Sequence, residues 1–184
     1  MKKNVILLLF IYLFSSCHIN GALQGMYSYY KITNKEAPNL INILSPNSNI
    51  CDIKSNGGPK VYAITGKQLF SCISSLPKAI IYIWSPKCKS KFCYSLDYVQ
   101  NIANVHKTDL YIVSEYYDSY FLNASYNIMN PILGINTESY KTNLTSKYMR
   151  KFYSDLKIKN DENYRILYFE YGILKRAFNN IEEI

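Results

Sequence analysis

The chain has 184 residues, of which 48% are hydrophobic and 18% charged, and its formal net charge is +8. This length and composition indicate one globular domain with an N-terminal appendage, without internal repeats or coiled-coil heptads. The basic excess suits an anionic membrane surface as well as nucleic acid. No basic run is interleaved with aromatic residues, and no zinc-finger or RNA-binding pattern occurs, so we expect no nucleic-acid partner.

The first seventeen residues predict a signal peptide. A positively charged start, Met1–Asn4, precedes an unbroken apolar run over 5–14. That run is too short to span a membrane, which takes about 20 residues, and it has the length of a signal-peptide core. It leads into Leu-Phe-Ser-Ser before Cys17, which resembles the lipobox of bacterial lipoproteins. This resemblance implies a signal peptide over 1–16 and lipidation of Cys17 by acyl chains such as palmitate, with ordinary secretion as the alternative.

The lipobox resemblance also implies a location. A lipid-anchored chain would lie in the bacterial cell envelope, facing the periplasm or on the outer membrane, with the membrane as a partner. Residues 17–59 mix Asn, Ser, Pro and Gly with short apolar pieces. They predict a tether followed by an irregular extension, with one strand near 39–44. We expect the folded domain to cover 60–184.

Four cysteines remain if Cys17 carries lipid, an even number in an oxidising compartment. Spacing favours a pair between Cys88 and Cys93. Cys51 and Cys72 would then pair with each other or stay free. Since Cys72 lies in an amphipathic stretch, we favour its interpretation as a small buried hydrophobic residue.

From residue 60 onward the pattern predicts alternating strands and helices. These are a strand over 60–65, an amphipathic helix over 66–76, an apolar strand over 79–84, a helix over 88–106 and a strand over 109–114. A helix between two apolar strands is a βαβ unit, so those strands should be parallel. No clear pattern covers 115–145. A helix over 146–156 follows, then a hairpin with strands over 163–169 and 173–178, and the start of a terminal helix.

Cys88 is the first candidate for chemistry. It follows the apolar strand and opens the predicted helix, where the helix dipole would favour the thiolate, and three lysines lie close to it in sequence: Lys87, Lys89 and Lys91. On a regular helix, residues five apart point about 140° away from each other. A disulfide with Cys93 therefore requires Cys88 to lie in the loop before the helix, or the first helical turn to unwind.

Three segments resemble the thioredoxin-like proteins that bacteria secrete or tether to membranes. These are Gly66-Lys67 with its amphipathic stretch, Ile83–Cys88, and the closing hairpin Tyr164–Gly172. The resemblance implies an α/β fold, with a central mixed sheet flanked by helices. It also implies thiol–disulfide exchange with a partner protein.

In that family the first cysteine is the nucleophile and the second resolves the mixed disulfide, roles that fall on Cys88 and Cys93. Trp84 and Pro86 correspond to the approach to the first cysteine, and Tyr164 stands where the family has a cis-proline. These three are candidates for substrate binding. We expect no cofactor. No metal is expected either, because the two histidines lie in the tether and at a helix end.

The four-residue spacer also resembles the atypical single-domain peroxiredoxins, which carry C-x4-C on this fold. That family has Thr or Ser three residues before its peroxidatic cysteine, and Ser85 stands there. Its catalytic arginine would correspond to Arg150, Arg165 or Arg176, with Arg165 the best candidate. The alternatives are therefore a thiol–disulfide oxidoreductase, a thiol peroxidase, and a binding module that retains the fold without the chemistry.

Overall fold

The structure is a computed structural model, and it describes residues 25–55, 59–158 and 164–184. The predicted signal peptide and Cys17 lie outside the described residues. The elements are α2 (Tyr30–Glu36), β1 (Ile41–Ile43), η1 (Ile50–Asp52), β2 (Val61–Ile64), α3 (Gly66–Ile73), β3 (Ala79–Trp84), α4 (Leu96–Val105), β4 (Asp109–Ser114), α5 (Ser119–Leu122), β5 (Ile132–Ile135), α6 (Thr145–Asp155), β6 (Ile166–Glu170), β7 (Ile173–Phe178) and η2 (Ile181–Glu183). Within the described residues, no helix is both long and apolar enough to cross a bilayer.

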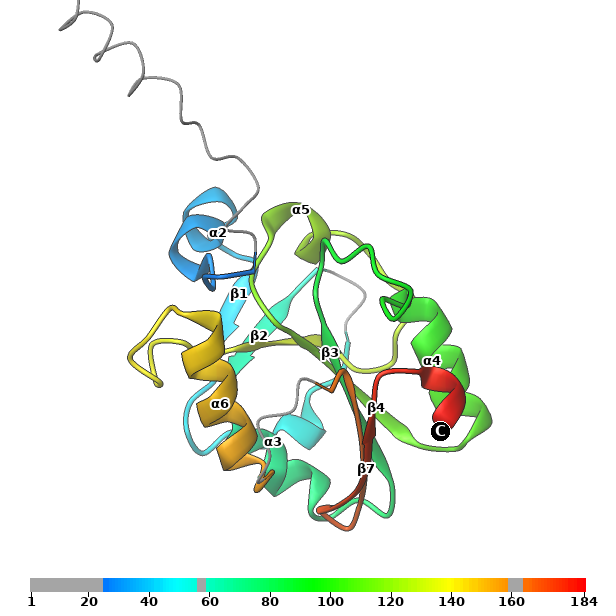
Figure 1. Cartoon of the computed structure of the whole chain (residues 1–184). Helices are drawn as coiled ribbons and strands as arrows, with labels where there is room; N and C mark the ends of the chain where they lie inside the picture. Colours follow the sequence, from blue (N-terminus) through cyan, green and yellow to red (C-terminus); the bar gives the residue numbers. More distant parts are fainter. Residues whose placement is uncertain (1–24, 56–58, 159–163) are drawn as a thin grey trace, which may run out of the picture.

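The strands form one seven-stranded mixed sheet in the order β1-β2-β5-β4-β3-β6-β7 (Figure 1). The first five strands in that order pair in parallel, and β6 and β7 are antiparallel to their neighbours. The predicted α/β class with a central mixed sheet flanked by helices is confirmed. The predicted parallel pair is confirmed as well, since β3 and β4 pair in register from Ala79–Asp109 to Trp84–Ser114.

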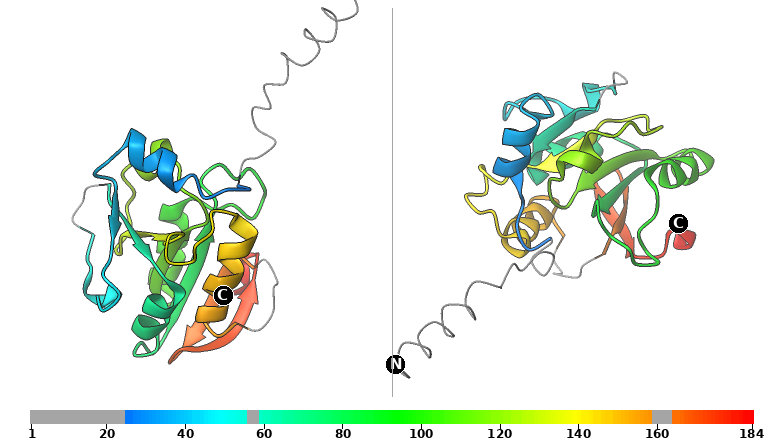
Figure 2. Two further views of the ribbon diagram at one scale, coloured as in Figure 1. Left: turned by 90° about the vertical axis from the view of Figure 1, so that its left-hand side faces the viewer. Right: turned by 90° about the horizontal axis from the view of Figure 1, so that it is seen from above.

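Helices cover both faces of this sheet (Figure 2), which explains why β3 is apolar along its whole length. All six residues of β3 are buried. Ile81 and Ile83 pack in the core that contains α3 and α6, whereas Ile80, Tyr82 and Trp84 pack in the core that contains α4. The central strand is therefore fixed from both sides, and so is the loop that begins at its end.

The segment without a clear pattern, 115–145, contains α5 and the strand β5. This strand lies between β2 and β4 in the sheet. It has four residues and contains Gly134, so the sequence carries little local indication of a strand. The glycine is required by packing, because a Cβ there would lie 2.6 Å from the ring of Tyr117.

The predicted helix over 88–106 is wrong in its first part. Helix α4 begins at Leu96, where Ser95 caps it by accepting a hydrogen bond from the backbone N–H of Tyr98. A capping serine seven residues after Cys88 therefore sets the helix start. The cysteines precede the helix, as the requirement for a disulfide at this spacing had predicted.

The N-terminal residues add an edge strand to the sheet, since β1 pairs with β2. The strand predicted near 39–44 is confirmed. Behind it, Cys51 forms a disulfide with Cys72, with a Cα–Cα distance of 5.4 Å. Cys72 is buried, as predicted, but its favoured interpretation as a small hydrophobic residue is wrong, because its sulfur is part of this disulfide. The Tyr111 hydroxyl lies 3.1 Å from that sulfur. This bridge ties η1 to α3.

Candidate functional site

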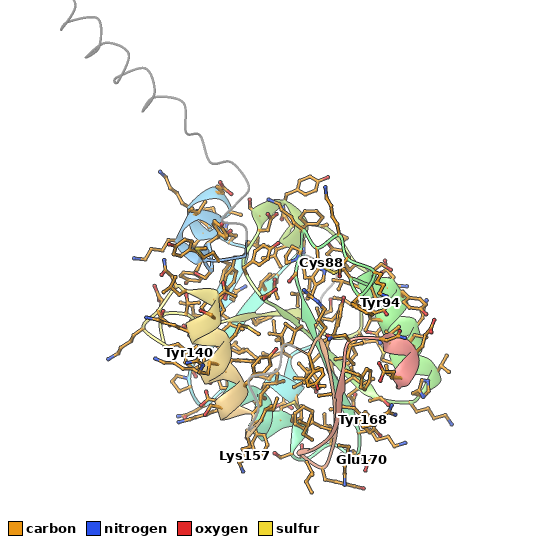
Figure 3. All side chains as sticks on the ribbon, viewed as in Figure 1. Cys88, Tyr94, Tyr140, Lys157, Tyr168 and Glu170 are labelled. Carbon is orange, nitrogen blue, oxygen red and sulfur yellow. A yellow bond between two sulfur atoms is a disulfide. The ribbon has the colours of Figure 1, made fainter. Side chains whose placement is uncertain are left out.

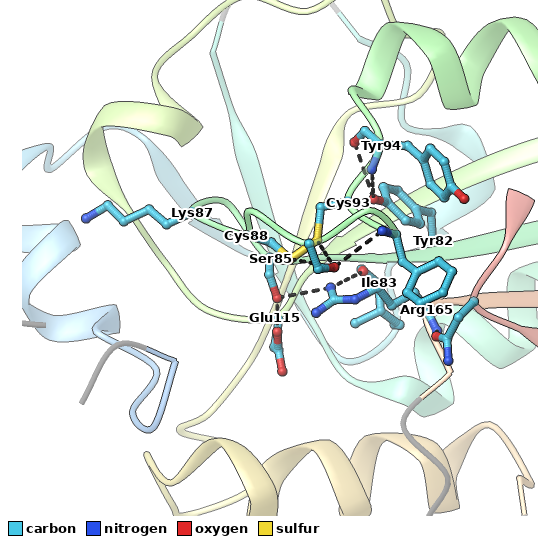
Figure 4. Close-up of a disulfide and its surroundings, with 12 residues drawn as sticks. Tyr82, Ile83, Ser85, Lys87, Cys88, Cys93, Tyr94, Glu115 and Arg165 are labelled. Carbon is cyan, nitrogen blue, oxygen red and sulfur yellow. Dashed lines mark hydrogen bonds between the residues drawn. A yellow bond between two sulfur atoms is a disulfide. The ribbon is translucent and has the colours of Figure 1, made fainter. Parts of the chain in front are cut away.

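The cysteine loop, residues 85–95, leaves the carboxyl end of β3 and contains two tight turns. The backbone N–H of Cys88 donates to the carbonyl of Ser85 over 3.0 Å, and that of Cys93 donates to the carbonyl of Ser90 over 3.1 Å. These turns bring the Cα atoms of the two cysteines to 5.8 Å, and their sulfurs are joined as a disulfide (Figure 4). Both cysteines are partly exposed.

The first part of the loop is held by residues that follow β4. The backbone N–H of Lys87 donates to the Tyr116 hydroxyl over 3.0 Å. The Lys87 ammonium forms an ion pair of 2.7 Å with Asp118, the residue that caps α5. These contacts fix the chain one residue before Cys88.

The second part of the loop is held by β3 itself. The backbone N–H of Tyr94 donates to the Tyr82 hydroxyl over 3.0 Å. The Tyr94 hydroxyl donates to Asn180 near the C-terminus, also over 3.0 Å. Because the loop is anchored on both sides, we expect its two cysteines to stay close when the disulfide opens. Closing so short a loop costs little entropy.

Two features predicted to stabilise a Cys88 thiolate lie elsewhere. Helix α4 starts eight residues after Cys88, whereas the effect of a helix dipole falls off within the first turn. The Lys87 ammonium pairs with the Asp118 carboxylate instead of a cysteine sulfur. The hydrogen bond between the two raises the pKa of Lys87. The Ser90 hydroxyl is closer to the sulfurs, at 3.1 Å from Cys93 and 3.6 Å from Cys88.

A polar cluster adjoins the start of the cysteine loop and joins three elements. The Ser85 hydroxyl donates to the carboxylate of Glu115, which follows β4. The Arg165 guanidinium, just before β6, donates to the same hydroxyl over 3.2 Å and to the Ile83 carbonyl over 3.4 Å. Figure 4 shows this cluster beside the disulfide. It places a cation, an anion and a hydroxyl next to the two sulfurs.

The candidate substrate-binding residues do not share one pocket. Trp84 is 7% exposed and packs edge-on against Tyr126 in the core on the α4 side. Tyr164 packs against the opposite core, and its carbonyl accepts a hydrogen bond from Tyr153. Pro86 is buried at the first turn of the loop. The sheet therefore separates the side chains of Trp84 and Tyr164.

Sequence reasoning identified Ser85 and Arg165 but missed Glu115, Ser90 and Tyr116. Glu115 carried a usable indication, because it directly follows a predicted strand parallel to β3. The carboxyl ends of parallel strands meet at one edge of a sheet, where ligand sites form. Tyr116 gave no such indication in a chain with 19 tyrosines.

The described residues contain no group of three or more His, Cys, Asp or Glu side chains placed to hold a metal ion. No protein-family model, curated protein or solved structure matches this chain.

Proposed function

We propose that this protein is a thiol–disulfide oxidoreductase of the bacterial cell envelope, with Cys88 as nucleophile and Cys93 as resolving cysteine. The observation that carries the proposal is the pairing of these cysteines in a partly exposed loop at the carboxyl end of the central strand. In the other disulfide only Cys51 is partly exposed, whereas Cys72 is 2% exposed.

The arrangement of the strands supports a thioredoxin-like fold. Strand β3 leads into the cysteine loop, β4 lies parallel to it on one side, and the β6–β7 hairpin lies on the other. Two of the three segments that carry the resemblance, Ile83–Cys88 and Tyr164–Gly172, fall at the start of the cysteine loop and on this hairpin. The lipid anchor at Cys17 completes the proposal, and a Cys17→Ser variant should lose its association with membranes.

The exchange runs in two steps. The Cys88 thiolate attacks a disulfide of the substrate protein, forming a mixed disulfide and releasing one substrate thiolate. The Cys93 thiolate then attacks the Cys88 sulfur, which releases the second substrate thiolate and leaves the Cys88–Cys93 disulfide. The substrate gains two electrons, and an external dithiol restores the reduced cysteines.

A second candidate function is that of a thiol peroxidase. It is favoured by the hydrogen bond between Arg165 and Ser85, the two residues that the peroxiredoxin resemblance singles out. In that reaction Cys88 attacks a peroxide, giving a sulfenic acid and releasing water or an alcohol. Cys93 then forms the disulfide and releases a second product, water.

The experiment that tests the first function combines trapping with redox titration. A Cys93→Ser variant should accumulate a mixed disulfide with a disulfide-bonded model protein, whereas the matched Cys88→Ser variant should not. Titration in glutathione buffers should give the Cys88–Cys93 pair a reduction potential above about −300 mV. Structural disulfides typically have reduction potentials below that value. No trapped species, together with a lower potential, would exclude the oxidoreductase. Peroxide consumption would then decide between the thiol peroxidase and the binding module.

A further inference from the structure

The carboxyl end of the sheet carries the disulfide and also the point at which the described chain begins. Residues 25–30 lie against the loop after β4: the Tyr117 N–H donates to the Ser28 carbonyl over 2.8 Å. The Tyr29 ring packs edge-on against Tyr116, whose hydroxyl accepts the hydrogen bond from Lys87. The N-terminal segment thus reaches the cysteine loop through one side chain.

This end carries exposed apolar side chains and a groove. Met26, Ile32 and Tyr120 are 47%, 55% and 80% exposed. Ile32 lines an open groove of about 670 Å³ between the start of α2 and residues 137–143, and most of the remaining lining is tyrosine, serine and threonine. Helices α2 and α5, which carry Ile32 and Tyr120, are joined by a hydrogen bond from Ser119 to Glu36.

The charge at this end is mainly basic. Lys31 and Lys141 line the groove, with Glu138 as its acidic residue. Lys35 is exposed one helical turn after Lys31, on the same side of α2. Glu36 is a second acidic residue here and accepts a hydrogen bond from Ser119, so three lysines lie beside two glutamates. Lysines beside exposed apolar side chains are the combination by which proteins bind the surface of an anionic bilayer.

The proposed anchor is close to this end. Gly25 follows Cys17 by eight positions, so a fully extended connection spans at most about 28 Å. If acyl chains on Cys17 lie in the bilayer, the start of the folded domain lies within that distance of it. The opposite end of the sheet lies farther from Gly25 by the length of the strands.

We propose that the α2–α5 end of the domain docks on an anionic bilayer, so that the Cys88–Cys93 loop faces the membrane surface. The inference rests on the lipid anchor of the proposed function, and it adds an orientation. The disulfide would then exchange with a partner whose cysteines lie at the membrane surface. Figure 3 shows Cys88 and Glu170 toward opposite ends of the molecule, so the end with the disulfide is distinct from the end that would face away from the bilayer.

The test uses the full-length protein, isolated with its anchor and reconstituted into phosphatidylglycerol vesicles that carry brominated acyl chains. Tryptophan is introduced at exposed apolar positions, Ile32→Trp at the docked end and Val105→Trp at the far end, where α4 runs into β4. The native Trp84 is buried and provides the background in the parent protein. Bromine should quench Trp emission in Ile32→Trp and leave Val105→Trp at the background level.

A charge variant sharpens the test. In Ile32→Trp, adding Lys31→Glu and Lys35→Glu should reduce the quenching, because each lysine near an anionic surface favours docking roughly fivefold. Lys78→Glu, an exposed position before β3, should not. Equal quenching of the two reporters would overturn the orientation and leave the anchor standing. Failure of the protein to sediment with vesicles would overturn both, whereas the redox titration of Cys88 and Cys93 tests the chemistry independently.

Discussion

The guanidinium of Arg165 donates a hydrogen bond to the hydroxyl of Ser85 over 3.2 Å, although the two residues are 80 positions apart in the sequence. Ser85 lies three residues before Cys88, and the same guanidinium also binds the carbonyl of Ile83. A cation and a hydroxyl are thereby held at the carboxyl end of β3, beside the sulfurs. Such preorganised donors stabilise charge that develops on an oxygen in a transition state.

This relationship separates the two candidate enzymes. If the protein reduces peroxides, Arg165→Lys should slow the reaction roughly 100-fold, the usual effect of removing one such donor. Exchange with a disulfide substrate should change little, because no oxyanion forms there. Stopped-flow measurement of peroxide consumption beside a disulfide-reduction assay checks both rates. Arg176→Lys is the matched control, since Arg176 is exposed on β7 and stacks on Phe178.

An Arg165→Lys variant that loses both activities equally would indicate that the arginine only supports the loop. A parent protein that consumes no peroxide would remove the peroxidase from consideration. Circular dichroism of each variant confirms that the fold is retained.

The Cys51–Cys72 disulfide should act on stability rather than on redox activity. It closes a loop across 21 positions, for which chain entropy predicts a contribution of about 3 kcal/mol. In a Cys51→Ala/Cys72→Ala double variant, the free energy of unfolding should therefore fall by about that amount, which lowers the urea midpoint. Combined with Cys93→Ser, the double variant should still trap a mixed disulfide at Cys88. Loss of trapping in a folded variant would show that the two disulfides are coupled.

Gly134→Ala tests strand β5. The added Cβ would lie 2.6 Å from the ring of Tyr117, a fully buried side chain whose hydroxyl donates to the Ile135 carbonyl. Overpacking of this kind costs about 1–3 kcal/mol. Urea denaturation measures the loss, and Ser125→Ala, in an exposed loop of the same segment, is the control. An unchanged midpoint for Gly134→Ala would contradict the insertion of β5 between β2 and β4.

Stability should fall at alkaline pH. Burial raises the pKa of Tyr111 to about 12 from an ordinary value of 10.0. Between these values the unfolded state loses the phenolic proton before the folded state does, so the free energy of unfolding decreases as pH rises. The contribution is complete below pH 10 and is lost through about pH 12.

Urea midpoints across that range, followed with tyrosinate absorbance, check the direction. Tyr111→Phe cannot ionise and should show a smaller alkaline loss, although other buried tyrosines continue to contribute. Tyr120→Phe, at an 80% exposed position, should follow the parent protein. An alkaline loss as large in Tyr111→Phe as in the parent would exclude Tyr111 as a source.

The sequence by itself determined the centre of the fold and the position of its cysteines. The apolar runs of β3 and β4 were identified with their bounds, because a strand buried on both faces must be continuously apolar. The helix between them indicated their parallel pairing. The spacing of Cys88 and Cys93 required an irregular segment if they pair, which is a consequence of helix geometry alone.

Only the tertiary structure decided what surrounds those cysteines. The contacts of Ser85 with Glu115 and Arg165 join residues 30 and 80 positions apart. Lys87 pairs with Asp118, which caps α5, rather than with a thiolate. Strand β5 could not be predicted from the sequence, because four residues that include a glycine have little strand propensity of their own. The neighbouring strands supply its hydrogen bonds. The local sequence pattern predicts burial and the period of a helix or strand. The hydrogen-bond partners of a polar side chain depend on the path of the whole chain.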